Sequence, residues 1–289
     1  MIFLLLSVLS GDYQNLFMDA ENLGMGGIRT SHPLSVFDNP VSSSLNPTSI
    51  TIHGALNFLG LSRSIAINGG MKRGSRSLGF ALLYNQVPDI EDTRNALIDE
   101  NGNGVLDPGE DLDSTKIVYF TSHQSLLIIG FSRKAGRLYT GFNVKFLYQV
   151  LGEYRGVGAG FDFGLFYKLK NIEFGLTIRD ASYTSIFWEN LIEKIPPRFD
   201  FGGTYFFDTR AGRFRISVES IIDEMGVSPH LGIGWDFLGW GFASIGLNDG
   251  ALSSGIGLKI SQIRTSFSLS LHEELPLTVR FTLSKGFYK

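Results

Sequence analysis

From about residue 50 onward, apolar residues alternate with polar or small ones at a period of two. In the segment 156–168, for example, Phe161 and Phe163 flank Asp162, and glycines occupy most of the other alternate positions. A period of two predicts strands that hold one face in an apolar environment. The segments with this pattern lie near 50–59, 62–72, 76–85, 124–134, 138–149, 156–168, 171–180, 198–208, 212–222, 228–237, 240–248, 251–260, 263–272 and 277–287.

The length of these segments favours a membrane barrel over a soluble sandwich. They run to about 10 residues, enough to cross the hydrocarbon region when tilted, whereas soluble strands average about 5–6. Very short connections alternate with longer ones, as in outer-membrane barrels. We therefore expect an all-β chain whose residues 50–289 form a transmembrane antiparallel β-barrel of about 14 strands in the bacterial outer membrane. Both chain ends should face the periplasm, and the longest extracellular loop should span 86–123; within it, Lys116–Thr121 either joins the fourth strand or forms a strand of its own.

The first residues lack this alternation. Residues 1–11 are a short apolar stretch that ends in Ser10-Gly11, typical of a signal-peptide remnant, although the basic start of such a signal is missing. The alternative is a buried first strand.

Residues 12–49 are rich in Gly, Ser, Asn and Pro. Glycine permits close backbone approach, and apolar residues within the segment give it material to bury. We predict an N-terminal segment inside the lumen that acts as a plug; the alternative is a flexible periplasmic tail. The residues expected to shape the plug are Gly24, Gly26, Gly27, Asp38, Asn46 and Pro47.

Composition agrees with export. The chain has 35 Gly and 24 Phe among 289 residues, no Cys, and only 18 % charged residues. Without Cys there is no disulfide framework or thiolate metal site. The net charge of −3 gives no sign of a nucleic-acid surface. Membrane lipid is the partner that a Phe-rich outer face implies.

The sharpest local motif lies in the long loop. Residues 99–110 fit the twelve-residue calcium pattern D-x-[DN]-x-[DN]-G-x5-E at every defined position. Calcium prefers six to eight oxygen ligands, so a structural Ca²⁺ is expected in this loop; the alternative is an acidic, Gly-rich turn without an ion. The predicted ligands are Asp99, Asn101, Asn103, Val105 through its carbonyl, Asp107 and Glu110.

Charged residues on the faces opposite the phenylalanines should line the lumen. They form a selectivity lining or, as we favour, ion pairs that fill the interior around the plug. These residues are Lys145, Arg179, Arg213, Arg215, Glu219, Arg264 and Arg280.

No motif supports catalysis. Ser270 and His272 share one strand face, but that spacing is ordinary alternation, and no third partner or oxyanion motif accompanies them. We therefore predict that the protein is not an enzyme and has no catalytic residues.

The segment AENLGMGGIRTS, followed by SVFDNPVSSSLNP, resembles the opening of PorV/PorQ-type outer-membrane proteins, which are similar to FadL-type transporters. Weaker matches at 137–149, 158–168 and 196–203 extend the resemblance over most of the chain, although Thr48 stands where the family usually has Ala. The resemblance implies a 14-stranded barrel with an internal N-terminal segment. It implies a PorV-like role in type IX-like protein secretion and surface attachment, with secreted cargo or secretion-system proteins as partners. The alternative is FadL-like passive transport of a hydrophobic small molecule.

Overall fold

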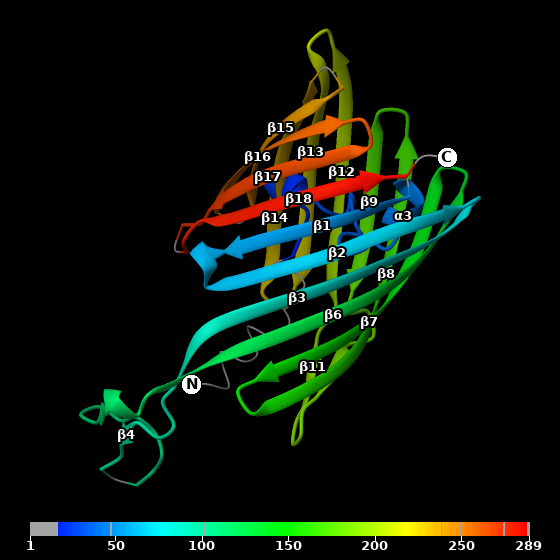
Figure 1. Ribbon diagram of the computed structural model, residues 1–289. Coiled ribbons are helices and arrows are strands. Elements are labelled where there is room, and N and C mark those ends of the chain that lie inside the picture. Colours follow the sequence, from blue (N-terminus) through cyan, green and yellow to red (C-terminus); the bar gives the residue numbers. More distant parts are fainter. Residues whose placement is uncertain are drawn as a thin grey trace.

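The chain forms one closed antiparallel β-barrel of 14 strands, as the alternation predicts (Figure 1). This computed structural model describes residues 17–46, 48–100, 102–237, 239–248, 250–273 and 275–287. Each strand pairs with its neighbours in sequence, and β1 closes the ring by pairing with β18. The barrel strands are β1 (Ser49–Asn57), β2 (Ser62–Arg73), β3 (Arg76–Asp92), β6 (Val118–Ala135), β7 (Leu138–Leu151), β8 (Tyr154–Leu169), β9 (Ile172–Arg179), β12 (Arg198–Thr209), β13 (Gly212–Asp223), β14 (Gly226–Phe237), β15 (Gly241–Asn248), β16 (Ala251–Ile260), β17 (Ile263–Leu271) and β18 (Thr278–Gly286).

The two ends of the barrel differ. The end that carries Ser49 and Gly286 is called the terminal end below, and it also holds the short β2–β3, β6–β7 and β8–β9 turns. The opposite end, called the loop end, carries the short helix η1 (Phe58–Gly60) between β1 and β2 and all of the longer connections. That the terminal end faces the periplasm remains a prediction.

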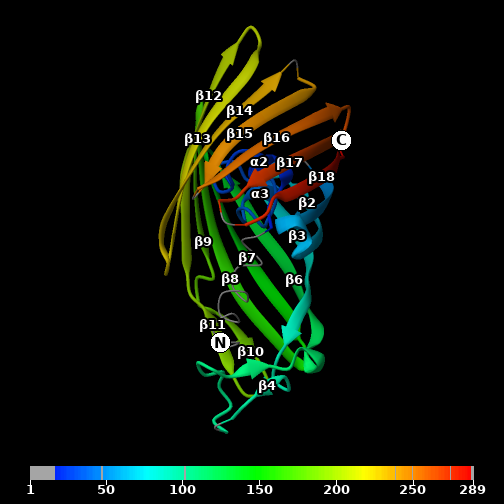
Figure 2. The same ribbon diagram turned by 90° about the vertical axis from the view of Figure 1, so that its left-hand side faces the viewer.

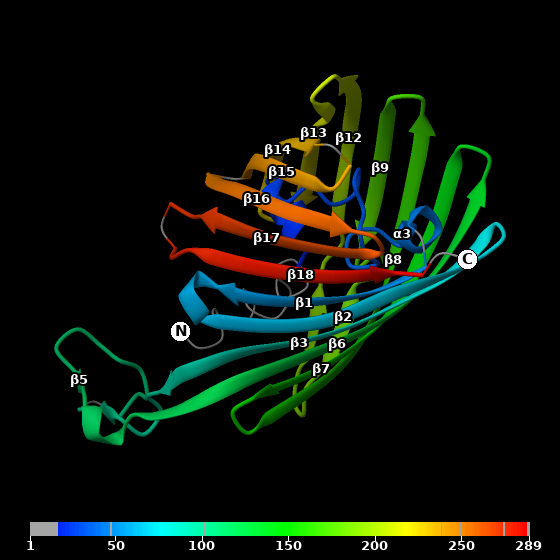
Figure 3. The same cartoon turned by 45° about the horizontal axis from the view of Figure 1, so that its top comes forward.

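The predicted loop 86–123 was too long. β3 continues to Asp92 and β6 begins at Val118, so these two strands run on beyond their neighbours (Figure 3). A bulge between Val87 and Ile90, with Asp89 at φ 55°, shifts the register and interrupts the alternation, which is why the pattern ended early. The remaining loop contains the small hairpin of β4 (Leu97–Ile98) and β5 (Asp111–Leu112) and the turn η2 (Ser114–Lys116).

The predicted loop 181–197 also contains two short strands. β10 (Thr184–Phe187) and β11 (Ile192–Ile195) form a hairpin, and β10 continues the pairing of β9 along β8. Between β9 and β10 the chain bulges at Asp180–Tyr183, where both named residues have positive φ. The bulge breaks the period of two, so the sequence pattern could not extend the strand past it.

The outer face of the barrel is apolar. Side chains that point outward from β3 and β7, such as Phe80 and Phe146, are 42 % and 48 % exposed although they are large and apolar. Near the terminal end an unbroken aromatic series runs from β12 to the turn between β14 and β15, and its neighbouring ring centroids lie 5.0–6.1 Å apart. Such girdles mark the edge of the hydrocarbon region. None of the described helices is long and apolar enough to span a membrane.

The lumen is occupied by residues 17–46, which lie inside the ring of strands (Figure 2). This stretch, called the N-terminal segment below, contains two short helices, α2 (Ala20–Gly24) and α3 (Ser42–Leu45). The Asp19 carboxylate caps α2 by accepting the N–H of Glu21 at 2.8 Å.

Candidate functional site

The N-terminal segment makes a circuit around the inner wall. α2 contacts β15 to β18, and α3 contacts β2, β3 and β6 on the other side. Between the helices, Thr30 bonds to Thr177 of β9 at 2.6 Å, and the Asn39 amide donates to the Leu165 carbonyl of β8 at 3.3 Å. The segment therefore touches most of the barrel strands, which fixes it across the lumen.

Inward glycines of the barrel make room for this circuit. A Cβ on Gly141 would lie 2.9 Å from the backbone of Pro40, and one on Gly79 would lie 2.5 Å from a methyl group of Val36. The same clash with the N-terminal segment arises at inward glycines of β9, β14 and β15. These inward glycines, called the glycine belt below, let the backbone of the segment lie directly against the barrel strands.

Most of the predicted lumen charges bind this segment instead of lining an open pore. Arg179 donates to the carbonyls of Phe37 and Asp38 at 2.6 and 2.7 Å and pairs with Asp200 at 2.7 Å. Glu219 accepts the N–H groups of residues 29–31 at 2.9–3.4 Å. These side chains satisfy backbone groups that would otherwise be buried without partners.

Two more lumen arginines hold α2. Arg215 pairs with the fully buried Glu21 at 2.5 Å, and Arg264 of β17 contacts the same carboxylate. Arg215 also donates to His32 at 2.7 Å; burial, followed by the charge of Arg215, lowers the pKa of His32 to about 4 and keeps the ring neutral. Helix α2 is therefore pinned from two sides of the barrel.

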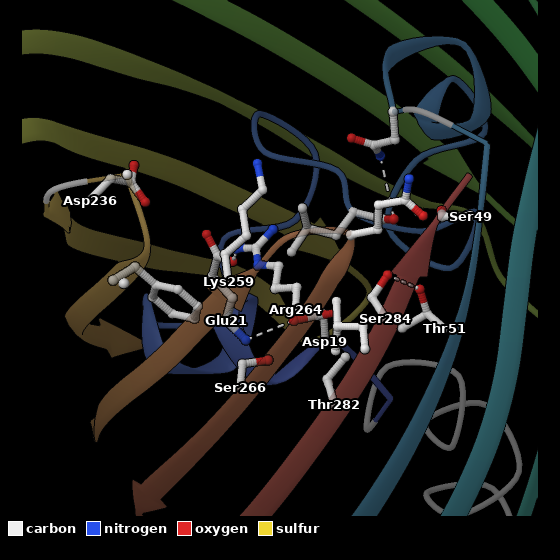
Figure 4. A pocket seen from close by; sticks show the side chains of 18 of the residues that line it. Asp19, Glu21, Ser49, Thr51, Asp236, Lys259, Arg264, Ser266, Thr282 and Ser284 are labelled. Atoms are coloured by element: carbon white, nitrogen blue, oxygen red, sulfur yellow. Dashed lines mark hydrogen bonds and ion pairs between the residues drawn. The ribbon is translucent and has the colours of Figure 1, made fainter. Parts of the chain in front are cut away.

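Beside this contact lies a cavity of about 450 Å³ at the terminal end (Figure 4). It is bounded by α2, β1 and β13 to β18, and both signs of charge line it. Asp19 and Glu21 belong to the segment, whereas Lys259 and Arg264 come from the wall.

Of the remaining lumen candidates, Arg280 also holds the segment, whereas Lys145 pairs with carboxylates and Arg213 lies at the rim. Arg280 donates to the carbonyl of Met18 at 3.1 Å. Lys145 is fully buried and pairs with Asp162 and Asp180 at 2.7 and 2.5 Å. Arg213 does not lie in the lumen: it is 49 % exposed at the terminal rim because its strand has only just begun there, and it pairs with Asp208 at 3.6 Å.

The residues predicted to shape the plug lie within the described segment, apart from Pro47. Gly24 ends α2 against Gly255 of β16, and Gly26 and Gly27 adopt φ of 75° and 77° beside β14 and β15. The Asp38 carboxylate accepts the N–H groups of Leu34 and Ser35, and the Asn46 amide donates to the carbonyl of Pro33 at 2.9 Å. Pro47 and the predicted signal-peptide residues 1–11 lie outside the described residues.

An apolar patch on the inner wall escaped the sequence analysis. It lies toward the loop end from the N-terminal segment, and Phe17, Val36 and Phe37 of that segment pack against it. Doubled apolar positions, as in Leu82-Leu83 and Leu126–Ile129, would have revealed strands that are apolar on both faces. This patch, called the apolar wall below, consists of Ala66, Ala81, Leu83, Leu126, Ile128, Leu147, Ile186 and Ile195.

The predicted calcium loop lies in the β4–β5 connection, away from the lumen (Figure 1). The Asp99 carboxylate accepts the N–H groups of Gly102 and Gly104 at 2.6 and 2.8 Å. The Asn103 amide donates to Asp107 at 2.7 Å, and Glu110 accepts the Asp107 N–H at 3.0 Å. Val105 is exposed within the loop, and Asn101 lies outside the described residues. In the described part of the chain, no three His, Cys, Asp or Glu side chains gather in a way that could hold a metal.

Ser270 and His272 are not joined by any hydrogen bond between described residues. The His272 ring instead lies 3.2 Å from the Thr278 hydroxyl. The Ser270 hydroxyl is buried and has no partner in the part of the chain that the structure describes.

Solved structures show what this fold resembles. No family model matches the sequence, and no curated protein matches it either. The P. putida toluene transporter TodX is similar at a TM-score of 0.62 and 12 % identity, over 94 % of this chain and 99 % of that one. A second structure of that transporter (0.60, 13 %, 93 % and 98 %) and the deltaS2S3 mutant of the TodX monoaromatic hydrocarbon channel (0.60, 11 %, 93 % and 99 %) are also similar.

The chain is therefore an outer-membrane β-barrel with the fold of these hydrocarbon channels. The neighbours are channels and not enzymes. Identities near 12 % establish the fold alone, and the resemblance to PorV/PorQ-type proteins stays a prediction.

Proposed function

We propose that the protein is a passive channel for small hydrophobic molecules across the outer membrane. The observation that carries the proposal is the apolar wall, an inward-facing hydrophobic surface where a barrel that served only water-soluble solutes would have a polar lining. The wall and the rings of Phe17 and Phe37 are at most 8 % exposed. A hydrophobic molecule entering from the loop end would therefore reach them only after the groups packed against them move.

The N-terminal segment would act as the plug of this channel. It crosses the lumen below the apolar wall, and arginine contacts hold it in place. A molecule that moves toward the terminal end therefore requires a movement of α2. The other route is a sideways exit between strands of the barrel. The bulge at Asp180–Tyr183 is the feature of the wall that would allow the second route.

The test is uptake of radiolabelled toluene into proteoliposomes that contain the purified protein. We expect the double variant Leu83→Asn/Ile128→Asn to slow uptake about tenfold, since a tenfold loss corresponds to about 1.4 kcal/mol of lost apolar contact. Both substitutions place an amide in the apolar wall. The matched control is Ser268→Asn, which adds an amide to the polar side of the lumen and should leave uptake unchanged.

Folding of each variant is checked by the slower electrophoretic migration of heat-unfolded barrels. Toluene uptake equal to that of protein-free liposomes would overturn the proposal, and so would equal loss in the control variant.

The secretion role is favoured by a different observation. β3 and β6 carry the β4–β5 hairpin away from the barrel, and the β10–β11 hairpin exposes Phe187, Leu191 and Ile192 (Figure 1). Purification in mild detergent with mass spectrometry tests this role. A stoichiometric secreted protein or secretion component, retained by the intact barrel and lost when residues 93–117 are shortened, would replace the simple channel proposal.

We further propose that the β4–β5 loop binds a structural Ca²⁺. The pairing of β4 with β5 brings the two ends of the motif together, so Asp99 and Glu110 lie next to each other at the base of the loop. Calcium should then slow proteolysis near Asn101, and the Glu110→Gln variant, which removes a bidentate ligand, should abolish that protection. Cleavage that is insensitive to calcium in the unaltered protein, together with no heat of binding, would refute the ion.

A further inference from the structure

Three arginines lie next to one another on the outer face of the barrel at the terminal end. Arg73 of β2 stands directly opposite Arg76 of β3, and Arg76 stands directly opposite Arg133 of β6. All three are exposed, and each shares the outward parity of the apolar side chains in its strand. This set is called the arginine row below.

The arginine row has no acidic partner within the described ranges, whereas two other exposed cations at the terminal end do. Arg213 pairs with Asp208, and Lys168 pairs with Glu173. Like charges directly opposite one another across strands are destabilising. The three neighbouring guanidinium groups therefore repel one another, and binding of an external anion would offset this repulsion.

The arginine row borders the apolar band. One inward–outward repeat further along the same strands, Met71, Leu78 and Phe131 stand opposite one another in an outward row, and this row continues through Phe142 and Phe163. Two strand residues span about 6.8 Å. An anion held by the arginines would thus lie at the edge of the hydrocarbon region and not in open water.

The row also continues sideways into a groove. Across the next strands, Arg133 of β6 is followed in the same outward row by Thr140 of β7, Leu165 of β8 and Leu176 of β9. A groove of about 270 Å³ opens here on the outer face, lined mainly by apolar side chains of β7, β8 and β9. The surface therefore offers cationic groups beside a slot that suits a hydrocarbon chain.

We propose that the arginine row and this groove form a binding site for an anionic phospholipid. Its phosphate would lie among the three guanidinium groups, which match phosphate oxygens through paired N–H donors. Its acyl chain would lie across Phe131 and Phe142 and enter the groove beside Thr140. With the terminal end in the periplasm, this lipid belongs to the inner leaflet of the outer membrane.

The test is native mass spectrometry of the intact barrel, released from detergent with phosphatidylglycerol at increasing concentration. The triple variant Arg73→Gln/Arg76→Gln/Arg133→Gln should weaken phosphatidylglycerol binding on the order of 100-fold, from the usual contribution of three basic residues near a membrane surface. The control triple variant Arg63→Gln/Arg155→Gln/Lys194→Gln removes the same charge at the loop end and should bind as the unaltered protein does.

A second variant tests the acyl part without any change of charge. Thr140→Trp fills the outer mouth of the groove and should lower phosphatidylglycerol retention severalfold while the barrel stays folded. Inorganic phosphate at millimolar concentration should not displace the lipid.

Equal binding by the arginine variant and the unaltered protein overturns the site, as does equal loss in the loop-end control. Displacement by inorganic phosphate would show a free-anion site, and preference for lipid A over phosphatidylglycerol would place the arginines in the outer leaflet. Either result refutes the assigned lipid.

Discussion

Two neighbouring parts of the lumen wall, separated by β1, are built from opposite chemistry within one alternating pattern. The apolar wall occupies β2, β3, β6, β7, β10 and β11. Beyond β1, β18 and its neighbours β17 and β16 present buried polar groups that follow the same inward parity. These form the polar wall, comprising Ser253, Ser266, Ser268, Ser270, Thr278, Arg280 and Thr282. The outward faces of both sides are equally apolar. Lipid therefore requires apolar side chains on the outer face of every strand, whereas the polarity of the inner face depends on what each strand contacts in the lumen.

Where the polar wall meets the N-terminal segment it holds that segment through hydrogen bonds, whereas the apolar wall meets the segment through rings and methyl groups. Loss of a polar contact therefore leaves buried groups unsatisfied, and loss of an apolar contact leaves a void. The predictions below use that asymmetry.

The largest effect is expected at Lys145, the buried cation beside Leu147 of the apolar wall. Lys145→Met leaves Asp162 and Asp180 buried without their counter-charge, which should destabilise the barrel by about 3–5 kcal/mol. The measurement is urea unfolding of the protein in lipid vesicles. Adding Asp162→Asn and Asp180→Asn should restore most of the lost stability. A Lys145→Met variant as stable as the unaltered protein would contradict the role assigned to the Lys145 ion pairs.

Next in size is Glu219, which anchors the segment to β13. Glu219→Ala removes the acceptor for the N–H groups of residues 29–31, at an expected cost of about 3 kcal/mol. The segment should then become accessible to protease at Arg29. Glu219→Gln keeps one oxygen acceptor and should lose less; equal losses would indicate that charge, not hydrogen bonding, holds the segment.

The smallest effects compare the two walls directly. Ile128→Val removes one methylene from the apolar wall and should cost about 1 kcal/mol. Ser268→Ala, on the polar wall, removes a buried hydroxyl that has no partner among the described residues, so it should cost less than the loss of the Ile128 methylene. A larger loss at Ser268 than at Ile128, in the same unfolding assay, would reverse the comparison.

Much of the barrel could be predicted because lipid imposes one rule on every strand. The alternation of Phe161 and Phe163 with Asp162 correctly oriented β8, and similar segments gave the strand count. Prediction failed at the bulges near Asp89 and Asp180, because a bulge resets the period without any apolar signal. It failed at Arg213 because parity gives the direction of a side chain but not its depth in the barrel.

The candidate site was predicted only in part. Charged residues such as Arg179 could be assigned to the interior, but their partners could not, since Asp200 and the carbonyl of Phe37 are distant in sequence. Ile186 and Ile195 fell in a predicted loop, so their contribution to the apolar wall was invisible.

By itself, the sequence determined that this chain crosses the outer membrane as an antiparallel barrel, because period-two hydrophobicity is a local property that each strand carries alone. Only the tertiary structure decided what the lumen contains. The circuit of the N-terminal segment, the glycine belt that admits it and the division into two walls depend on which inward side chains meet across the barrel, and closure of the ring fixes those meetings.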